Sequence, residues 1–215
     1  MQIAIALFDR FTMLDAIGPY QVLARLPGAE VTFVADQPGP IADNSGNHRV
    51  EAGAAFADLP RPDIIVVPGG PGEASHRDEG PLRDWLLAAD PTSEWTTSVC
   101  TGSLILAGAG LLTGRRATSH WLAMDVLRDL GAEPVNDRVV FDGKYVTAAG
   151  VSAGIDMALT LAGRIAGDQV AQTIQLGIEY DPQPPYDAGS PAKAPDEVVT
   201  YLRDRSRLVR PFADQ

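Results

Sequence analysis

The sequence predicts an α/β protein with a mostly parallel sheet and helices on both of its faces. Short apolar runs, typical of strands buried on both sides, alternate with segments whose apolar residues recur at helical spacing. Two of these strands lead into unusual turns. Asp63–Val67 runs into the glycine-rich sequence PGGPG, and Thr96–Val99 runs into Cys100, the only cysteine of the chain. Because ligands of such sheets bind beyond the carboxyl ends of the strands, these turns are the first candidates for a functional site.

The first half of the chain contains three expected strands and two expected helices. Pro19 is expected in the first turn of the first helix, where the backbone N–H has no helical partner and proline is tolerated. Residues 38–47 are rich in Gly, Pro, Asn and Asp and predict a turn or a β-hairpin, with residues 48–52 as the returning strand. In chain order, the expected elements are strand Ile3–Leu7, a helix from Asp15 or Gly18 to about Arg25, strand Glu30–Ala35, strand Asp63–Val67 and helix Pro81–Ala89.

The second half begins with the strand before Cys100 and a helix after it. Ser152–Ala166 is apolar enough to predict a buried helix, and Asp168 is expected to cap the next one. Residues 181–195 are rich in proline and are expected to lie extended on a surface of this chain or of a partner. The other expected elements are a short strand Arg115–Thr118, helix Trp121–Leu130, a hairpin of Val139–Phe141 with Tyr145–Ala148, a helix ending near Ile178 and a charged helix over residues 196–209. We find no internal repeat and expect residues 1–215 to form a single domain.

Composition and charge favour a small molecule or another protein as partner. The formal net charge of −11 disfavours binding to the phosphate backbone of a nucleic acid. No apolar run approaches the roughly 18 residues of a membrane span, and the first residues are expected to form a strand, not a signal peptide. A single cysteine excludes an internal disulfide, which fits the reducing cytoplasm, so we expect a cytoplasmic protein. No cluster has the spacing of metal ligands, so neither a metal nor another cofactor is expected.

Cys100 is the candidate nucleophile because it lies where a strand turns into a helix. A side chain at such a turn projects from the end of the sheet, close to the free N–H groups of the helix. These groups favour an anion, so we expect the pKa of the thiol to lie below its usual value of about 8.5. The alternative is a small buried hydrophobic residue, which is what most free cysteines are.

Residues of the neighbouring turns are candidates to assist this thiol. The N–H groups of Gly70 in the PGGPG loop and of Thr101 are expected to stabilise an anion on a substrate attacked by sulfur, and Gly69 in the same loop is a further candidate for binding the substrate. Asp15 lies among apolar residues near the start of the first helix, where it is either the N-cap or a buried carboxyl able to hold a proton. We expect Asp15 and Cys100 to share one proton, held by Asp15 while the sulfur is ionised.

The three histidines are weaker candidates. His48 and His76 are expected on the surface. His120 follows a short strand and either contacts substrate or serves a structural purpose. The glycines of the PGGPG loop match neither a GxxxxGK[ST] nor a GxGxxG pattern, so nucleotide binding is not expected.

Several of these stretches together resemble the ThiJ/PfpI superfamily: PGGPG after a buried strand, VCTGS around Cys100, and ATSHW ending at Trp121. Within it, LDAIGP, SVCTGSLILAGAGLLTGRRATSHW and LGIEYDPQPPYDAGSP resemble the isonitrile (isocyanide) hydratases, which add water to an isocyanide to give an N-formamide. The resemblance covers nearly the whole chain. It implies a flavodoxin-like fold with Cys100 as nucleophile, Asp15 as acid–base partner, and Thr101 and Gly70 on the oxyanion side. It also implies a homodimer, which would give the proline-rich segment a surface to lie on.

This chemistry suits the residues, and two alternatives stay open. Attack of sulfur on the terminal carbon of an isocyanide would give a thioimidate, which water would convert into the formamide. Peptide hydrolysis is disfavoured because Thr101, not a histidine, follows Cys100, and because Asp15 stands where the glyoxalase and chaperone branch has a glutamate. The alternatives are a glyoxalase-like or other small-electrophile enzyme, and a non-enzymatic sensor in which Cys100 is oxidised.

Overall fold

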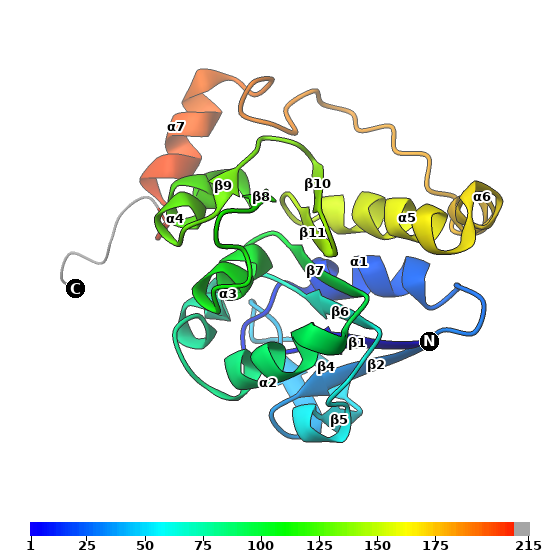
Figure 1. Ribbon diagram of the computed structural model, residues 1–215. Coiled ribbons are helices and arrows are strands. Elements are labelled where there is room, and N and C mark those ends of the chain that lie inside the picture. Colours follow the sequence, from blue (N-terminus) through cyan, green and yellow to red (C-terminus); the bar gives the residue numbers. More distant parts are fainter. Residues whose placement is uncertain (209–215) are drawn as a thin grey trace.

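A seven-stranded sheet forms the centre of the computed structural model, which describes residues 1–208 (Figure 1). The strand order is β10-β11-β7-β6-β1-β2-β5, and all neighbouring strands are parallel except β10 and β11. The strands are β1 (Gln2–Ala6), β2 (Glu30–Ala35), β5 (Ala54–Ala55), β6 (Ile64–Val67), β7 (Trp95–Val99), β10 (Val139–Asp142) and β11 (Tyr145–Ala148). The mostly parallel sheet expected from the sequence is therefore confirmed.

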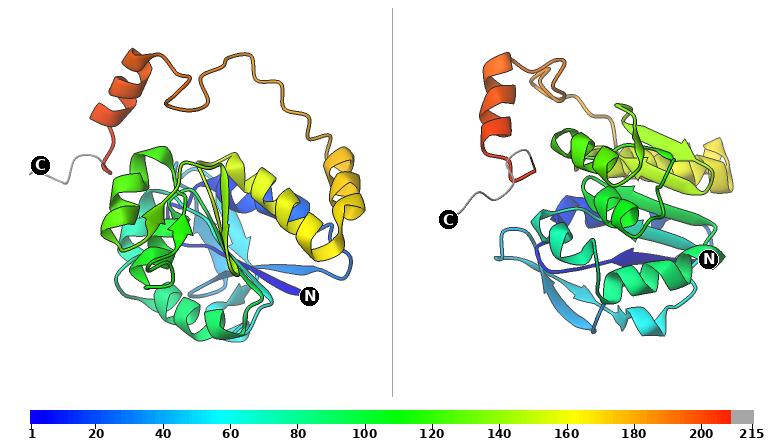
Figure 2. Two further views of the ribbon diagram at one scale, coloured as in Figure 1. Left: turned by 45° about the horizontal axis from the view of Figure 1, so that its top comes forward. Right: turned by 60° about the vertical axis from the view of Figure 1, so that its left-hand side comes forward.

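Helices cover both faces of this sheet (Figure 2). On one face α1 packs against α5, and α5 packs against α6; on the other face α3 lies beside α2 and α4. The α-helices are α1 (Met13–Leu23), α2 (Pro81–Ala89), α3 (Gly102–Gly108), α4 (Met124–Asp129), α5 (Ala153–Ala166), α6 (Asp168–Gly177) and α7 (Asp196–Asp204). The 3-10 helices are η1 (Phe56–Asp58), η2 (Pro71–His76), η3 (Asp90–Thr92) and η4 (Trp121–Ala123). No helix within residues 1–208 has both the length and the apolar character needed to cross a bilayer.

Two small two-stranded sheets flank the central one. The expected hairpin after β2 forms from β3 (Gly39–Ala42) and β4 (Arg49–Ala52), which pair antiparallel. The short strand expected near Arg115 is β8 (Arg116–Ala117), and it pairs in parallel with β9 (Glu133–Pro134).

The structure corrects the expected start of the first helix. α1 begins at Met13, so Pro19 lies inside the helix and not in its first turn. The first turn is set by Thr12, whose carbonyl accepts a hydrogen bond from the N–H of Asp15 at 3.0 Å. Pro19 is retained because it packs closely on α5: a Cβ on Gly154 would lie 3.2 Å from the proline ring. Packing between helices thus outweighs the usual placement of proline.

Four smaller expectations also need correction. Gly167, with φ of 87°, precedes α6, and Asp168 is the first helical residue instead of its cap. Helix Trp121–Leu130 divides into η4 and α4. Only one face of α5 is buried, because α5 packs on α1 and the sheet through one side. α7 ends at Asp204, short of the expected 209, which lies outside the described residues.

The C-terminal segment leaves the body of the molecule and returns to it. Residues 181–195 form no helix or strand and are mostly exposed, as expected for a proline-rich stretch. Figure 1 shows this stretch running from α6 to α7 above the rest of the chain. α7 then approaches η4, where the Arg203 guanidinium lies 5.7 Å from the centre of the Trp121 ring.

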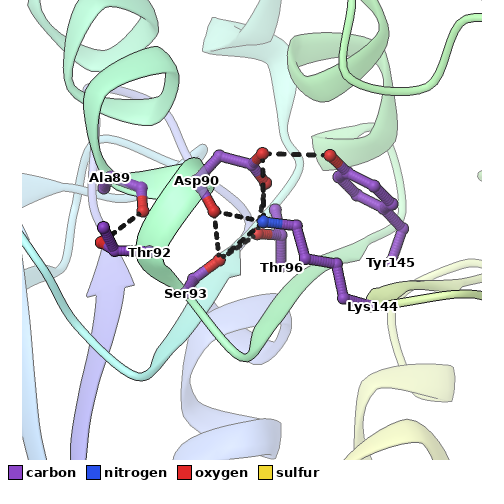
Figure 3. A network of polar contacts seen from close by, with 7 residues as sticks. All are labelled: Ala89, Asp90, Thr92, Ser93, Thr96, Lys144 and Tyr145. Atoms are coloured by element: carbon purple, nitrogen blue, oxygen red, sulfur yellow. Dashed lines mark hydrogen bonds and ion pairs between the residues drawn. The ribbon is translucent and has the colours of Figure 1, made fainter.

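A network of polar contacts fixes the amino ends of β7 and β11 (Figure 3). Asp90 accepts hydrogen bonds from Thr96 Oγ1 at 2.7 Å and from the Tyr145 hydroxyl at 3.0 Å. Its Oδ2 also lies 3.2 Å from Lys144 Nζ. The other ends of these two strands hold the residues of the candidate site.

Candidate active site

Cys100 lies in the turn between β7 and α3, at the carboxyl end of its strand. Its φ is +57°, a left-handed conformation that residues other than glycine seldom adopt. The turn is held by the Cys100 N–H, which donates to the carbonyls of Ala148 and Ala149 at 3.1 and 2.9 Å. Cys100 is only 6% exposed. The sharp turn expected from the sequence is present, and the neighbouring strand β11 helps to hold it.

Asp15 lies in the first turn of α1 and is fully buried. Its Oδ2 accepts a hydrogen bond from the N–H of Gly69 at 2.9 Å. Oδ1 is buried and has no hydrogen-bond partner among the described residues, while the Cys100 thiol lies beside the same carboxyl. Thr12 occupies the N-cap position, so of the two readings of Asp15 the buried carboxyl is correct.

Burial raises the pKa values of both partners. The pKa of Asp15 rises to about 7 because of desolvation, although the Gly69 N–H and interaction with Cys100 act in the opposite direction. The pKa of Cys100 rises to about 12, first because of desolvation and then because of the negative charge of Asp15. The N–H groups of Val151 and Thr101 lower the thiol pKa, but by less. The expected depression of the thiol pKa is therefore wrong, since burial and a neighbouring carboxylate outweigh the start of the helix.

The same pKa values locate the shared proton. Once one proton has left the pair, the more strongly raised pKa of the thiol favours the remaining proton on sulfur and the negative charge on Asp15. This location of the proton is the reverse of the one expected from the sequence. A base for the thiol is thus already in place beside it.

The glycine loop holds the site together through its backbone. The N–H of Gly70 donates to Thr101 Oγ1 at 2.9 Å, just as the N–H of Gly69 donates to Asp15. A Cβ on Gly69 would lie 2.5 Å from the Thr101 nitrogen, so only glycine allows this approach. The expectation that Gly70 offers a free N–H to an anion is therefore wrong, because the Thr101 hydroxyl already accepts it.

The N–H of Val151 is a feature that sequence reasoning missed. It donates toward the Cys100 sulfur from the turn between β11 and α5. Val151 has φ of +20°, an unusual value for a β-branched residue. The available signal was its position, since Val151, like Cys100, lies in a turn between a strand and a helix. Ser119 was missed as well, and its hydroxyl donates to the Cys100 carbonyl at 3.0 Å.

A family model confirms the resemblance seen in the sequence. Residues 1–164 match the model of the DJ-1/PfpI family. The chain belongs to the DJ-1/PfpI family.

Individual relatives extend the comparison to nearly the whole chain. Isonitrile hydratase from Pseudomonas putida is 45% identical over 206 residues, which cover 96% of this chain and 90% of the relative. The crystal structure of a ThiJ/PfpI family protein from Pseudomonas syringae superposes with a TM-score of 0.90 at 35% identity, over 94% of this chain and 84% of that one. Drosophila melanogaster DJ-1beta, at 22% identity, matches with a TM-score of 0.75 over 83% of this chain and 97% of that chain, and shows the fold alone.

In this DJ-1/PfpI chain the histidines have structural surroundings. His120 Nδ1 accepts the N–H of Leu122 at 3.3 Å and so caps η4, and its ring lies 5.9 Å from that of Trp121. His48 is exposed as expected. His76 is half-buried against Phe8, with ring centres 5.1 Å apart, so its expected surface position is only partly right. Within residues 1–208, no group of three His, Cys, Asp or Glu residues could hold a metal ion.

Proposed function

We propose that this DJ-1/PfpI protein is an isocyanide hydratase that converts an isocyanide into an N-substituted formamide. One observation carries the proposal: the buried Cys100 thiol lies beside a buried Asp15 that can both accept and return a proton at neutral pH. The 45% identity with the Pseudomonas putida isonitrile hydratase over 96% of the chain supports the substrate class.

In the first half of the reaction, sulfur adds to the isocyanide. Asp15 takes the thiol proton as Cys100 sulfur forms a bond to the terminal carbon, and returns this proton to the same carbon. The product is a thioimidate, R–N=CH–S–Cys100, and Asp15 is again a carboxylate. The N–H groups of Thr101 and Val151 support the sulfur while it carries negative charge.

In the second half, water replaces sulfur. Asp15 accepts a proton from water as the water oxygen bonds to the thioimidate carbon, and passes this proton to the nitrogen. The carbon–sulfur bond then breaks as the new hydroxyl becomes the formyl carbonyl, Asp15 carries the hydroxyl proton to the sulfur, and the formamide R–NH–CHO leaves. The sum is one isocyanide and one water consumed for each formamide, with Cys100 and Asp15 restored. Gly69 and Thr101 act in both halves by holding Asp15 and the Gly70 peptide in place, and we give His120 no direct role.

We further propose that the chain acts in the cytoplasm as a homodimer with a single domain per subunit. A free cysteine as nucleophile fits a reducing compartment. The proline-rich stretch and α6 are exposed, which is consistent with their being covered by a second copy of the chain.

The test is a panel of alkyl and aryl isocyanides with the purified protein. We expect loss of the isocyanide with matching release of the formamide, and a protein adduct whose added mass equals that of the isocyanide. Consumption of methylglyoxal without consumption of any isocyanide would support a glyoxalase-like enzyme. If peroxide oxidises Cys100 and neither activity is present, the protein is a thiol-based sensor.

A further inference from the structure

Arg207 brings the C-terminal segment back to the glycine loop of the active site. Its Nη2 donates to the carbonyl of Gly70 at 3.1 Å, across 137 positions of sequence. The same nitrogen lies 3.4 Å from Oε1 of Glu73 in η2. The chain that leaves the body at residue 181 therefore returns to a loop next to the candidate nucleophile.

Glu73 explains why a guanidinium is held here. Its side chain is fully buried, and neither carboxylate oxygen has a hydrogen-bond partner of ordinary geometry among the described residues. Two cations face it, Arg77 with Nε 3.5 Å from Oε2, and Arg207. Burial raises the pKa of Glu73, while the charges of Arg77 and Arg207 lower it. A buried carboxylate of this kind requires compensation by positive charge.

The backbone of Gly70 connects Arg207 to the catalytic residues. Its carbonyl accepts from Arg207, its N–H donates to Thr101 Oγ1, and the N–H of Gly69 holds Asp15. If the Gly70 carbonyl moved, the Gly70 N–H that holds the hydroxyl of Thr101 would move with it. Thr101 is the residue next to the nucleophile. Arg207 thus fixes the outer side of the loop whose inner side forms the site.

The charge of Arg207 also reaches Cys100. The pKa of Arg207 is lowered, first by burial and also by Arg10 and Arg77, whereas the charges of Glu73 and of an ionised Cys100 raise it. The causes that dominate the pKa of Cys100 are burial, the negative charge of Asp15 and the N–H groups of Val151 and Thr101.

We infer that Arg207 is a positioning residue of the active site, which fixes the backbone of Gly70 and, through it, Thr101 beside the Cys100 sulfur. The C-terminal segment then contributes a residue to the active site. This inference rests on the proposed role of Cys100 as the nucleophile.

The test measures the alkylation rate of Cys100 by iodoacetamide as a function of pH, which reports on one thiol because the chain has one cysteine. We expect Arg207→Ala to slow alkylation about threefold or more at neutral pH, equivalent to half a pKa unit, and to shift the profile to higher pH. Arg207→Lys, which keeps the charge, should restore most of the rate. Arg205→Ala is the matched control, since Arg205 is exposed and stacks on Tyr201 at 3.9 Å. An Arg207→Ala profile equal to that of the wild type would overturn the inference.

A second set of measurements, in Glu73→Gln protein, separates the effect of losing the Arg207 guanidinium from the effect of leaving the Glu73 carboxylate uncompensated. Arg207→Ala leaves Glu73 with less positive charge, so its effect is measured again in Glu73→Gln protein, where no buried charge is left behind. Slower alkylation in this background assigns the effect to Arg207, and unchanged alkylation refutes it. The alkylation assay needs no isocyanide. Failure of the wild type to hydrate isocyanides would therefore refute the proposed function without deciding the role of Arg207.

Discussion

At the scale of single residues, the site depends on two buried groups whose environments would each disfavour a charge. Desolvation raises the pKa of Asp15 to about 7 and that of Cys100 to about 12, so near neutral pH the carboxyl can take up and release a proton beside a protonated thiol. A free anionic thiolate is not needed in the resting enzyme. In the proposed mechanism, the Asp15 carboxylate removes the thiol proton only as the carbon–sulfur bond forms.

Asp15→Asn is expected to lose about 10²-fold or more in isocyanide hydration, the usual effect of removing a general acid–base. In the wild type, kcat/KM should rise as the pH increases through about 7, because the protonated carboxyl cannot accept the thiol proton. The variant should show no such rise. A variant that hydrates isocyanides normally would contradict the role given to Asp15. Alkylation by iodoacetamide is the control and should persist.

Cys100→Ala is expected to abolish hydration and adduct formation while the fold is retained, because Cys100 lies in a turn at the rim of the core. Cysteine and alanine both have a Cβ and bear the same cost of the left-handed φ of +57°, so only the modest loss of stability from removing a buried sulfur is expected. Circular dichroism and thermal unfolding check the fold. Turnover near the wild-type rate would show that sulfur is not the nucleophile.

The sequence was sufficient to predict that Cys100, Asp15, Thr101 and the PGGPG loop meet, because the ends of parallel strands share one edge of the sheet. It did not reveal that the N–H groups of Gly69 and Gly70 are already engaged by Asp15 and Thr101. The sign of the thiol pKa shift was also missed, because a helix start can be read from a sequence but the depth of burial cannot. Arg207 was out of reach, since nothing local marks a contact over 137 positions.

At the scale of elements, β7 and β11 carry the site at one end and are fixed at the other by Asp90. Thr96 is the second residue of β7 and Tyr145 the first of β11, and both donate to the same carboxylate (Figure 3). The Arg115 guanidinium lies 4.4 Å from the centre of the Tyr145 ring and covers it. The strands that place Cys100 and its supporting N–H groups are therefore aligned by contacts far from the chemistry.

Tyr145→Phe is expected to lower the free energy of unfolding by about 1–3 kcal/mol near pH 8, the usual value for a hydrogen bond to a charged group. The pKa of Tyr145 is raised to about 12 by burial and then by Asp90. Because it is raised in the folded state, its contribution is complete below pH 10 and is lost as the pH rises toward 12. The difference between wild type and variant in urea unfolding should shrink over this range. A difference that stays constant from pH 8 to pH 11 would contradict this assignment.

The strands were easier to predict than the helix boundaries. The strands β2 and β11 have the expected bounds. Among the helices α2 does as well, because the proline at its first position fixes where it begins. α1 was misplaced because its proline is accommodated by close contact with Gly154, a tertiary contact that local patterns do not contain.

At the scale of the whole molecule, large apolar side chains lie exposed on the segment between α5 and α7. Leu176 of α6 is 81% exposed, and Tyr186 in the proline-rich stretch is 80% exposed. Static light scattering at micromolar concentration is expected to give the mass of a dimer, with this segment across the two-fold axis. A monomer would contradict the proposed assembly.

Leu176→Asp is expected to weaken this dimer by at least tenfold in Kd, because it would bury a charge in the interface. Leu87→Asp is the matched control, since Leu87 is also partly exposed but lies on α2, on the opposite face of the sheet. Equal dissociation of both variants on dilution would place the interface elsewhere.

The two edges of the central sheet restrict how molecules can join at all. β5 has two residues and leads directly into η1, so that edge presents almost no ladder to a second molecule. At the other edge, β8 packs against β10, and the Arg116 N–H donates to the Asp142 side chain at 2.9 Å. Unprotected edges are where folded chains recruit one another into continuous sheets and aggregates. In this molecule β8 covers the β10 edge and the β5 edge is only two residues long, so crowded solutions of it should resist fibril-like assembly.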